Sequence, residues 1–161
     1  MSLASPFPRG FALDVSQGWR RGPGGHNGVD LRAPVGTPLL AMGDGRVSLV
    51  LDAAGGGRSG NAIGVTTDDG AFYSFSHMRD PSPLSRGARV VEGQQLGVVG
   101  MTGDTGGPHL HLHVDVAGVD TDPLDVIDPS RASSAGGGAL VAGVVLGGGA
   151  LAFLLWRSHR T

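Results

Sequence analysis

The stretch Gly107-Pro108-His109-Leu110-His111-Leu112-His113-Val114 holds half of the six histidines of the chain. Its strict alternation of histidine with Leu and Val predicts a β-strand, because successive side chains of a strand point to opposite faces. All three imidazoles then share one face, behind a turn marked by Gly106-Gly107-Pro108. Imidazole is a common zinc ligand and titrates near neutral pH, so this strand face is a candidate part of a metal-binding or catalytic site. The alternative is a polar strand face that happens to use histidine.

Composition narrows the classes of function. A chain of 161 residues suffices for one compact domain with a core. Its net charge is −2 and it has no lysine and no basic block, so we expect no nucleic-acid partner. It has no cysteine, which excludes disulfides, thiolate zinc ligands and cysteine nucleophiles. Any metal site must therefore use His and carboxylates, and Glu92 is the sole glutamate.

Short apolar runs separated by Gly, Pro, Asn and Asp turns fill the chain from residue 18 onwards. Their length and alternation predict an all-β fold, a compact antiparallel sheet or sandwich spanning residues 18–129. Residues 1–17, interrupted by prolines, are expected to form an irregular lead-in. The Gly-rich segment 53–60 is predicted as a flexible hairpin tip and the segment 79–89 as a loop. The predicted strands are 28–31, 38–41, 45–51, 62–67, 71–77, 95–100 and 109–117.

The C-terminal tail has a different composition. Residues 130–138 form a Ser/Ala/Gly linker, and the apolar run 139–156 follows without a charge. The 25 residues from 132 to 156 carry no charge, and as a helix at 1.5 Å per residue they would extend about 37 Å, enough for a hydrocarbon core of about 30 Å. The apolar part, 139–156, is predicted to be a transmembrane helix anchored by Trp156 and the basic tail 157–161. Gly143 and Gly147 have the small-xxx-small spacing that packs against a partner helix. The alternative is a buried hairpin or a Gly-rich tail.

A second candidate cluster, His26-Asn27-Gly28-Val29-Asp30, precedes a predicted strand. The Asn-Gly pair argues against a helix, so His26 and Asp30 are expected to come from a turn and the strand after it. Together with a histidine of the 109–113 strand they would give three protein ligands, the number that a catalytic zinc needs. A third element, Tyr73-Ser-Phe-Ser-His77-Met78, ends just before a Pro-rich loop, where functional side chains are often displayed. Taken alone, His77 is better explained as a structural residue with satisfied hydrogen bonds.

These elements together resemble the lysostaphin/LytM-type zinc metalloendopeptidases, a family of cell-wall peptidases. The resemblance covers roughly residues 18–127. It rests on the order and spacing of Gly25-His26-Asn27-Gly28-Val29-Asp30-Leu31, Ala33-Pro34-Val35-Gly36-Thr37-Pro38, Ala41-Met42-Gly43-Asp44-Gly45-Arg46-Val47, Phe75-Ser76-His77-Met78, Val91-Glu92-Gly93-Gln94-Gln95-Leu96-Gly97 and the run from Gly100 to His111.

The resemblance implies zinc ligands His26, Asp30 and His111, and it makes His77 and His109 the catalytic pair beside the metal. Zinc lowers the pKa of its water and polarises the scissile carbonyl, and protons must then move near pH 7. Glu92 lies in an apparent turn away from these motifs, so the proton transfers fall to histidine. We assign His109 as the base, with His77 stabilising the oxyanion or protonating the leaving amine.

The sequence departs from the family pattern at two places. Phe75 stands where the family usually has Tyr, and Leu112 and His113 stand where an aromatic residue and a carboxylate are common. Tyr73 lies one strand step further away on the same face, and we do not expect it to replace the missing hydroxyl. His113 faces the same side as His109 and His111, and we expect it not to be a ligand, although a fourth-ligand or supporting role is conceivable.

The sequence therefore predicts a zinc endopeptidase that cuts peptide cross-links or stems of bacterial peptidoglycan. The predicted tail would make it a single-pass membrane protein of the cell envelope or of a membrane-containing virion. Residues 1–10 lack the features of a secretory signal peptide, and a phage lytic enzyme that is packaged in a virion would not need one. The alternative functions are a non-catalytic peptidoglycan-binding protein and a structural membrane protein of a virion or envelope.

Overall fold

The computed structural model describes residues 1–133, and the predicted linker end, membrane helix, Gly143/Gly147 face and basic tail lie outside the described residues. Within the described part, no helix is long and apolar enough to cross a bilayer. The fold is mostly β, as the spacing of apolar runs predicts. Its strands are β1 (Leu3–Ala4), β2 (Val15–Gln17), β3 (Val29–Arg32), β4 (Pro38–Leu40), β5 (Gly45–Leu51), β6 (Asn61–Thr67), β7 (Ala71–Met78), β8 (Arg89–Val90), β9 (Gln95–Val98), β10 (His109–Val116), β11 (Val119–Thr121) and β12 (Ile127–Asp128).

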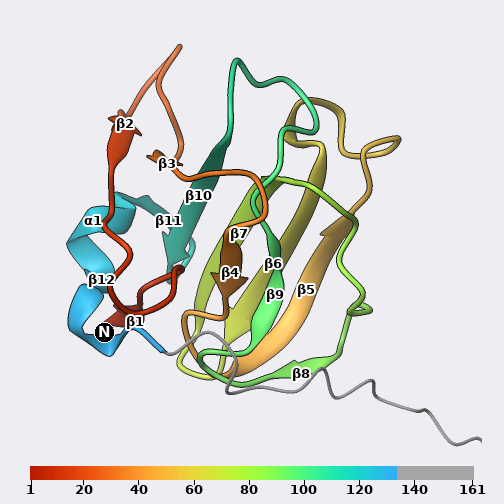
Figure 1. The fold of residues 1–161 in the computed structure, drawn as a ribbon. Coiled ribbons are helices and arrows are strands. Elements are labelled where there is room, and N and C mark those ends of the chain that lie inside the picture. Colours follow the sequence, from red (N-terminus) through yellow and green to blue (C-terminus); the bar gives the residue numbers. More distant parts are fainter. Residues whose placement is uncertain (134–161) are drawn as a thin grey trace, which may run out of the picture.

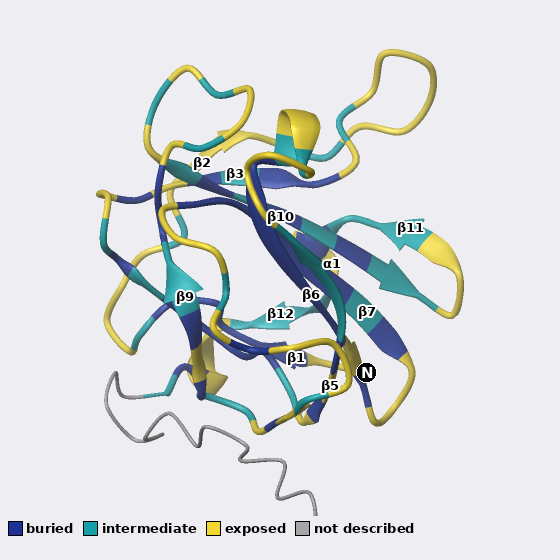
Figure 2. Ribbon diagram, turned by 90° about the vertical axis from the view of Figure 1, so that its right-hand side faces the viewer, coloured by how far each residue is buried: buried dark blue, intermediate teal, exposed yellow. Residues whose placement is uncertain are grey.

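The main sheet has eight strands in the order β2-β3-β10-β7-β6-β5-β8, with β11 paired to β10. Each pairing in it is antiparallel. A separate antiparallel ribbon of β4 and β9 lies in front of this sheet in Figure 1 and to its left in Figure 2. The core lies between these layers, because Leu39 and Leu96 from the ribbon and Val65, Phe75 and Leu112 from the sheet belong to one buried cluster.

The two ends of the described chain meet beside this core. β1 pairs in parallel with β12, and Leu3 and Phe7 are buried in the main cluster. Residues 1–17, expected as an irregular lead-in, contain two short strands, β1 and β2, and burial of Leu3 and Phe7 fixes the first part of the segment against the core. The linker expected from residue 130 also begins later, since a 3-10 turn, η2 (Pro129–Arg131), and the buried Ala132 continue the fold.

Short helical turns occur at two other places. Helix α1 (Pro123–Val126) begins after Asp122, whose carboxylate accepts a hydrogen bond from the Leu124 amide, with proline at the first helical position. The segment expected to be a flexible tip contains the 3-10 turn η1 (Gly57–Ser59), whose Arg58 carbonyl accepts a hydrogen bond from the Asp104 amide of a neighbouring loop at 2.9 Å.

Candidate functional site

Strand β10 carries the histidine face that its alternation predicts. Leu110, Leu112 and Val114 are fully buried in the core, and the histidines between them lie on the opposite, partly open face. Figure 2 shows this alternation of burial along the strand. In the sheet, His111 lies directly opposite Asp30 on β3 and Ser76 on β7. The antiparallel register thus brings together residues that are far apart in the sequence.

Three predicted zinc ligands converge at this point. His26 Nε2 lies 3.1 Å from His111 Nδ1 and 3.2 Å from Asp30 Oδ1, and His111 Nδ1 lies 2.8 Å from the same carboxylate oxygen. Ligand bonds of 2.0–2.1 Å in a tetrahedron place neighbouring donor atoms about 3.3 Å apart. The donor set and its spacing therefore fit a zinc ion held by His26, Asp30 and His111.

The loop before β3 orients His26. The backbone amides and carbonyls of Arg20 and His26 exchange two hydrogen bonds, which close the turn between them. The Nδ1 atom of His26 donates to the carbonyl of Gly18 at 3.0 Å. A carbonyl can only accept, so Nδ1 carries the proton and Nε2 presents its lone pair to the ligand site.

Asp30 is ionised in this setting. Its partial burial acts to raise the pKa, but the hydrogen bond from His111 and the charges of His26, His109 and His111 outweigh burial and lower the pKa below its usual value. An ionised carboxylate is the form that binds a metal ion.

His77 reaches the same cleft through an irregularity in β7. Simple alternation would place His77 on the core face with Tyr73 and Phe75. Strand β7 spans three steps between Phe75 and Met78 while β6 spans two between their partners, so the pairing contains a bulge. At the bulge His77 has a φ of 61°, in the left-handed region that non-glycine residues rarely adopt. This local distortion turns the imidazole towards the cleft, whose lining includes His77.

His77 and His109 face each other, with ring centroids 4.7 Å apart. His77 Nδ1 donates to the Thr102 carbonyl at 2.8 Å, and His109 Nδ1 donates to the Gly107 carbonyl at 2.9 Å, with the Thr105 hydroxyl 3.1 Å away. In both rings Nε2 therefore points away from the backbone carbonyl that Nδ1 binds. Burial lowers the pKa of His77 below its ordinary value, so its neutral form prevails near pH 7.

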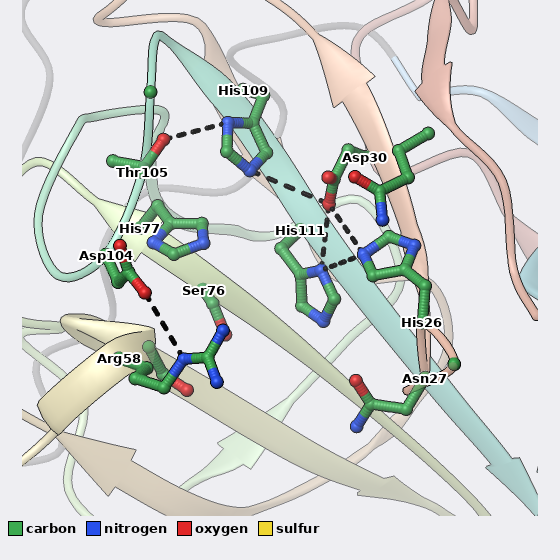
Figure 3. A pocket seen from close by; sticks show the side chains of 14 residues that line it. His26, Asn27, Asp30, Arg58, Ser76, His77, Asp104, Thr105, His109 and His111 are labelled. Carbon is green, nitrogen blue, oxygen red and sulfur yellow. Dashed lines mark hydrogen bonds and ion pairs between the residues drawn. The ribbon is translucent and has the colours of Figure 1, made fainter. Parts of the chain in front are cut away.

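These residues line a single cleft of about 530 Å³. Figure 3 shows His26 and Asp30 on one side of it, Arg58, Asp104 and His77 on the other, and His109 and His111 between them. No spacing in the sequence marks Thr102, Asp104 or Thr105, because their place at the cleft arises only from the approach of two loops; Arg58 lies in the Gly-rich segment 53–60.

The departures from the family pattern lie outside the ligand cluster. Phe75 and Tyr73 are both fully buried, and the Tyr73 hydroxyl accepts a hydrogen bond from the Met42 amide, so neither ring is part of the cleft. His113 bonds through Nδ1 to the Asn27 carbonyl and does not belong to the ligand group. Glu92 pairs with Arg131 and does not line the cleft.

Gly28 allows the two ligand strands to approach. A Cβ atom there would lie 2.4 Å from the carbonyl oxygen of Leu112 and 3.0 Å from Nε2 of His111. Backbone atoms of β10 cannot yield as the end of a flexible side chain can, so any larger residue at position 28 must displace the strand that carries His111.

The model of peptidase family M23 matches residues 24–123, more than half of the chain. The chain belongs to peptidase family M23. The matched range contains each of His26, Asp30, His77, His109 and His111. Peptidases of this family depend on zinc, in agreement with the donor set of this M23 domain.

Individual relatives give the same assignment. The chain is 34% identical over 111 residues to the peptidoglycan DD-endopeptidase ShyC of Vibrio cholerae, which covers 69% of this chain and 25% of that protein. A zinc-containing peptidase from Vibrio cholerae has a TM-score of 0.64 at 27% identity, covering 77% of this chain and 40% of that one. The catalytic domain of the antimicrobial peptidase lysostaphin from Staphylococcus simulans has a TM-score of 0.58 at 27% identity, covering 70% and 90%. The chain spans about a quarter of the length of the curated relatives it matches.

Proposed function

We propose that this M23 protein is a zinc endopeptidase that hydrolyses peptide cross-links or stems of bacterial peptidoglycan. One observation carries the proposal: the His26–Asp30–His111 ligand group opens onto a cleft in which two further histidines, His77 and His109, present Nε2 atoms. A site for metal binding alone would not need this second pair.

The chemistry follows from these side chains. A zinc ion at His26, Asp30 and His111 would supply a water of lowered pKa and polarise the peptide carbonyl. His109 Nε2 lies 3.6 Å from Asp30 Oδ1, close to the ligand group, and as the base it takes a proton there. His77 lies beside the His109 ring and, in its protonated form, would donate from Nε2 to the oxyanion or to the leaving amine. Because burial lowers the pKa of His77, its imidazolium is a stronger acid than a solvent-exposed one.

The substrate class is supported by the relatives and by the cleft. ShyC is by its name a peptidoglycan DD-endopeptidase, and lysostaphin is described as an antimicrobial peptidase. The cleft is lined mainly by polar and charged side chains, which suits a peptide more than a small apolar ligand.

Digestion of purified peptidoglycan tests the proposal. The 161-residue protein is incubated with walls that have direct or glycine-bridged cross-links, with zinc or after chelation, and new amino termini are measured. We expect release that stops on chelation, returns with zinc and is absent in His109→Ala, while the exposed Arg86→Ala serves as the matched control. Zinc bound by the protein without cleavage of any wall type would instead support a non-catalytic peptidoglycan-binding protein.

We also propose that the protein is anchored to a membrane through residues 139–156, in a cell envelope or a membrane-containing virion such as that of a phage, with Gly143 and Gly147 against a partner helix. The support is the uncharged apolar composition of this stretch and its length. Flotation of the full chain with lipid vesicles tests it: the protein should rise with the vesicles, and a variant with Arg at positions 146 and 151 should remain in solution.

A further inference from the structure

The β2–β3 loop (residues 18–28) carries one ligand of the zinc site and part of the wall of the cleft. Its residues Gly25, His26 and Asn27 line the cleft, and residues 20–25 are all exposed to solvent. An exposed loop has few packing contacts that hold its position. A metal ligand on such a loop therefore needs other contacts that keep its ring in place.

Hydrogen bonds inside the loop fix its shape. Arg20 and His26 exchange two backbone hydrogen bonds, and a Cβ atom at Gly25 would lie 2.2 Å from the Arg20 carbonyl oxygen. The bond from His26 Nδ1 to the Gly18 carbonyl also joins two residues of the loop. These contacts act within the loop, so its position against β10, which carries His111, depends on contacts with other elements.

Two side chains of the β10–β11 hairpin make such contacts. At the end of the loop next to β3, the Asn27 carbonyl accepts a hydrogen bond from His113 Nδ1. Near the other end, Trp19 Nε1 donates to Asp120 Oδ1 at 3.1 Å. The same Asp120 oxygen lies 3.6 Å from His113 Nδ1. One connected group of side chains therefore holds both ends of the loop.

The register of the hairpin places both side chains on the histidine face of β10. Asp115 lies directly opposite Asp120, and directly opposite residues share one face of a sheet. His113 shares this face with Asp115 and with the ligand His111, because alternate residues of a strand point the same way. His113 and Asp120 are thus diagonal neighbours beside the ligand group.

These contacts are shielded from water and specific in their donors. The side chains of His113 and Asp120 are 19% and 43% exposed, and Trp19 packs against the hydrophobic core. The Asn27 carbonyl can only accept, so His113 Nδ1 carries the proton. A carboxylate at position 113, which is common in the family, could not donate to this carbonyl. The contact therefore depends on the histidine that this chain has instead.

We propose that His113, Asp120 and Trp19 are positioning residues for the zinc ligand His26. They hold the two ends of its loop against the β10–β11 hairpin, so that His26 Nε2 stays 3.1 Å from His111 Nδ1 and 3.2 Å from Asp30 Oδ1. The three residues lie outside the ligand group itself. This inference rests on the zinc site of the proposed peptidase and assigns the residues that keep one of its ligands in place.

Zinc affinity of the full-length protein, measured by competition with a chromophoric chelator, tests the inference without a cleavage assay. We expect Trp19→Phe, Asp120→Ala and His113→Leu each to lower the affinity about tenfold, the smaller of the usual losses when the support of a metal ligand is removed. Asp120→Asn and His113→Asn should keep most of the affinity, because asparagine still accepts from the indole at position 120 and still offers an N–H near the position of Nδ1 at 113.

Asp115→Ala is the matched control. It removes a carboxylate from the same strand face, and within residues 1–133 no hydrogen bond or ion pair joins Asp115 to the loop. The visible absorption of the cobalt-substituted protein supplies a second measurement, since it reports the geometry of the ligands. The spectrum should change in Trp19→Phe and His113→Leu and match the wild type in His113→Asn and Asp115→Ala. Urea denaturation gives the folded fraction of each variant.

Several outcomes overturn the inference. Unaltered zinc affinity and cobalt spectra in Trp19→Phe and Asp120→Ala would do so, as would equal losses in His113→Asn and His113→Leu, or in Asp115→Ala and Asp120→Ala. If His113→Leu or Asp120→Ala does not fold, the milder Trp19→Phe, compared with Asp115→Ala, decides. A wild-type protein that binds zinc but cleaves no peptidoglycan would remove the proposed peptidase function and leave this inference intact.

Discussion

At the scale of single residues, backbone carbonyls decide what each histidine can do. His26, His77 and His109 each donate through Nδ1 to a carbonyl, of Gly18, Thr102 and Gly107 respectively. His111 is different, because its Nδ1 faces Asp30 and its Nε2 lies against the position of Gly28. The residue type makes the chemistry possible, and the hydrogen-bond partner of each ring selects the nitrogen that performs it.

The roles of His77 and His109 can be separated with a leaving group that needs no proton. A peptide amide is compared with an activated ester of the same acyl group. If His109 is the base, His109→Ala should lower turnover of both by about 10²–10⁴-fold, the usual contribution of a general base. His77→Ala should lower turnover of the amide and largely spare the ester if His77 protonates the leaving amine. Equal losses on both substrates would identify His77 as the oxyanion donor, and the reverse pattern would exchange the roles.

Gly28→Ala should weaken zinc binding, because the new Cβ would collide with the Leu112 carbonyl and approach His111. We expect zinc affinity to fall about 10- to 100-fold, the usual loss when the support of a metal ligand is disturbed, measured by competition with a chromophoric chelator. Gly106→Ala is the matched control, since nothing lies within 4 Å of its Cβ position. Unchanged zinc affinity in Gly28→Ala would show that β10 accommodates the methyl group.

At the scale of elements, the bulge in β7 is the feature that assembles the site. The left-handed conformation of His77 is a backbone strain, and surrounding contacts must hold it. Asn61 on β6 is buried, and its Nδ2 donates to the carbonyls of Met78 and Arg79, directly after His77. The Thr102 hydroxyl donates to the same Met78 carbonyl. Asn61 Oδ1 is buried without a hydrogen-bond partner among the described residues, and burial of this unpaired acceptor lowers the stability of the fold.

Asn61→Ala should affect both stability and catalysis. Loss of the two hydrogen bonds leaves buried carbonyls less satisfied, and the free energy of unfolding should fall by about 1–3 kcal/mol. The left-handed turn at His77 should relax, so that kcat falls more than KM changes. Urea denaturation and peptide kinetics measure the two effects, with Thr66→Ala on the exposed face of β6 as the control. A less stable variant with unaltered kcat would show that Asn61 does not hold the bulge.

At the scale of the whole molecule, the N-terminal segment closes the fold. Phe7 is fully buried, the Leu40 amide donates to the Pro6 carbonyl, and β1 pairs with β12 near the other end of the described chain. The main sheet and the β4–β9 ribbon share one core, so the stability of both depends on the packing of the N-terminal segment against that core.

Phe7→Ala should lower the free energy of unfolding by about 3–5 kcal/mol, the usual loss for a buried phenylalanine. Phe11→Ala is a matched control, because Phe11 is 36% exposed and should cost much less. Chemical denaturation of the two variants provides the comparison. Similar small losses would mean that residues 1–10 are not required for the core.

The sequence by itself predicted the β architecture and the histidine face of 109–113, because alternation and local turn residues are encoded over a few positions. Its resemblance to a known family indicated the family and implied the ligands His26, Asp30 and His111. Only the tertiary structure decided that His77 faces the cleft, that Phe75 and Tyr73 do not, and that Arg58 meets Asp104 there. Simple alternation assigns His77 to the core face, and the bulge against β6 reverses that assignment. The order of strands and the approach of loops are set by long-range packing, and no local pattern records them.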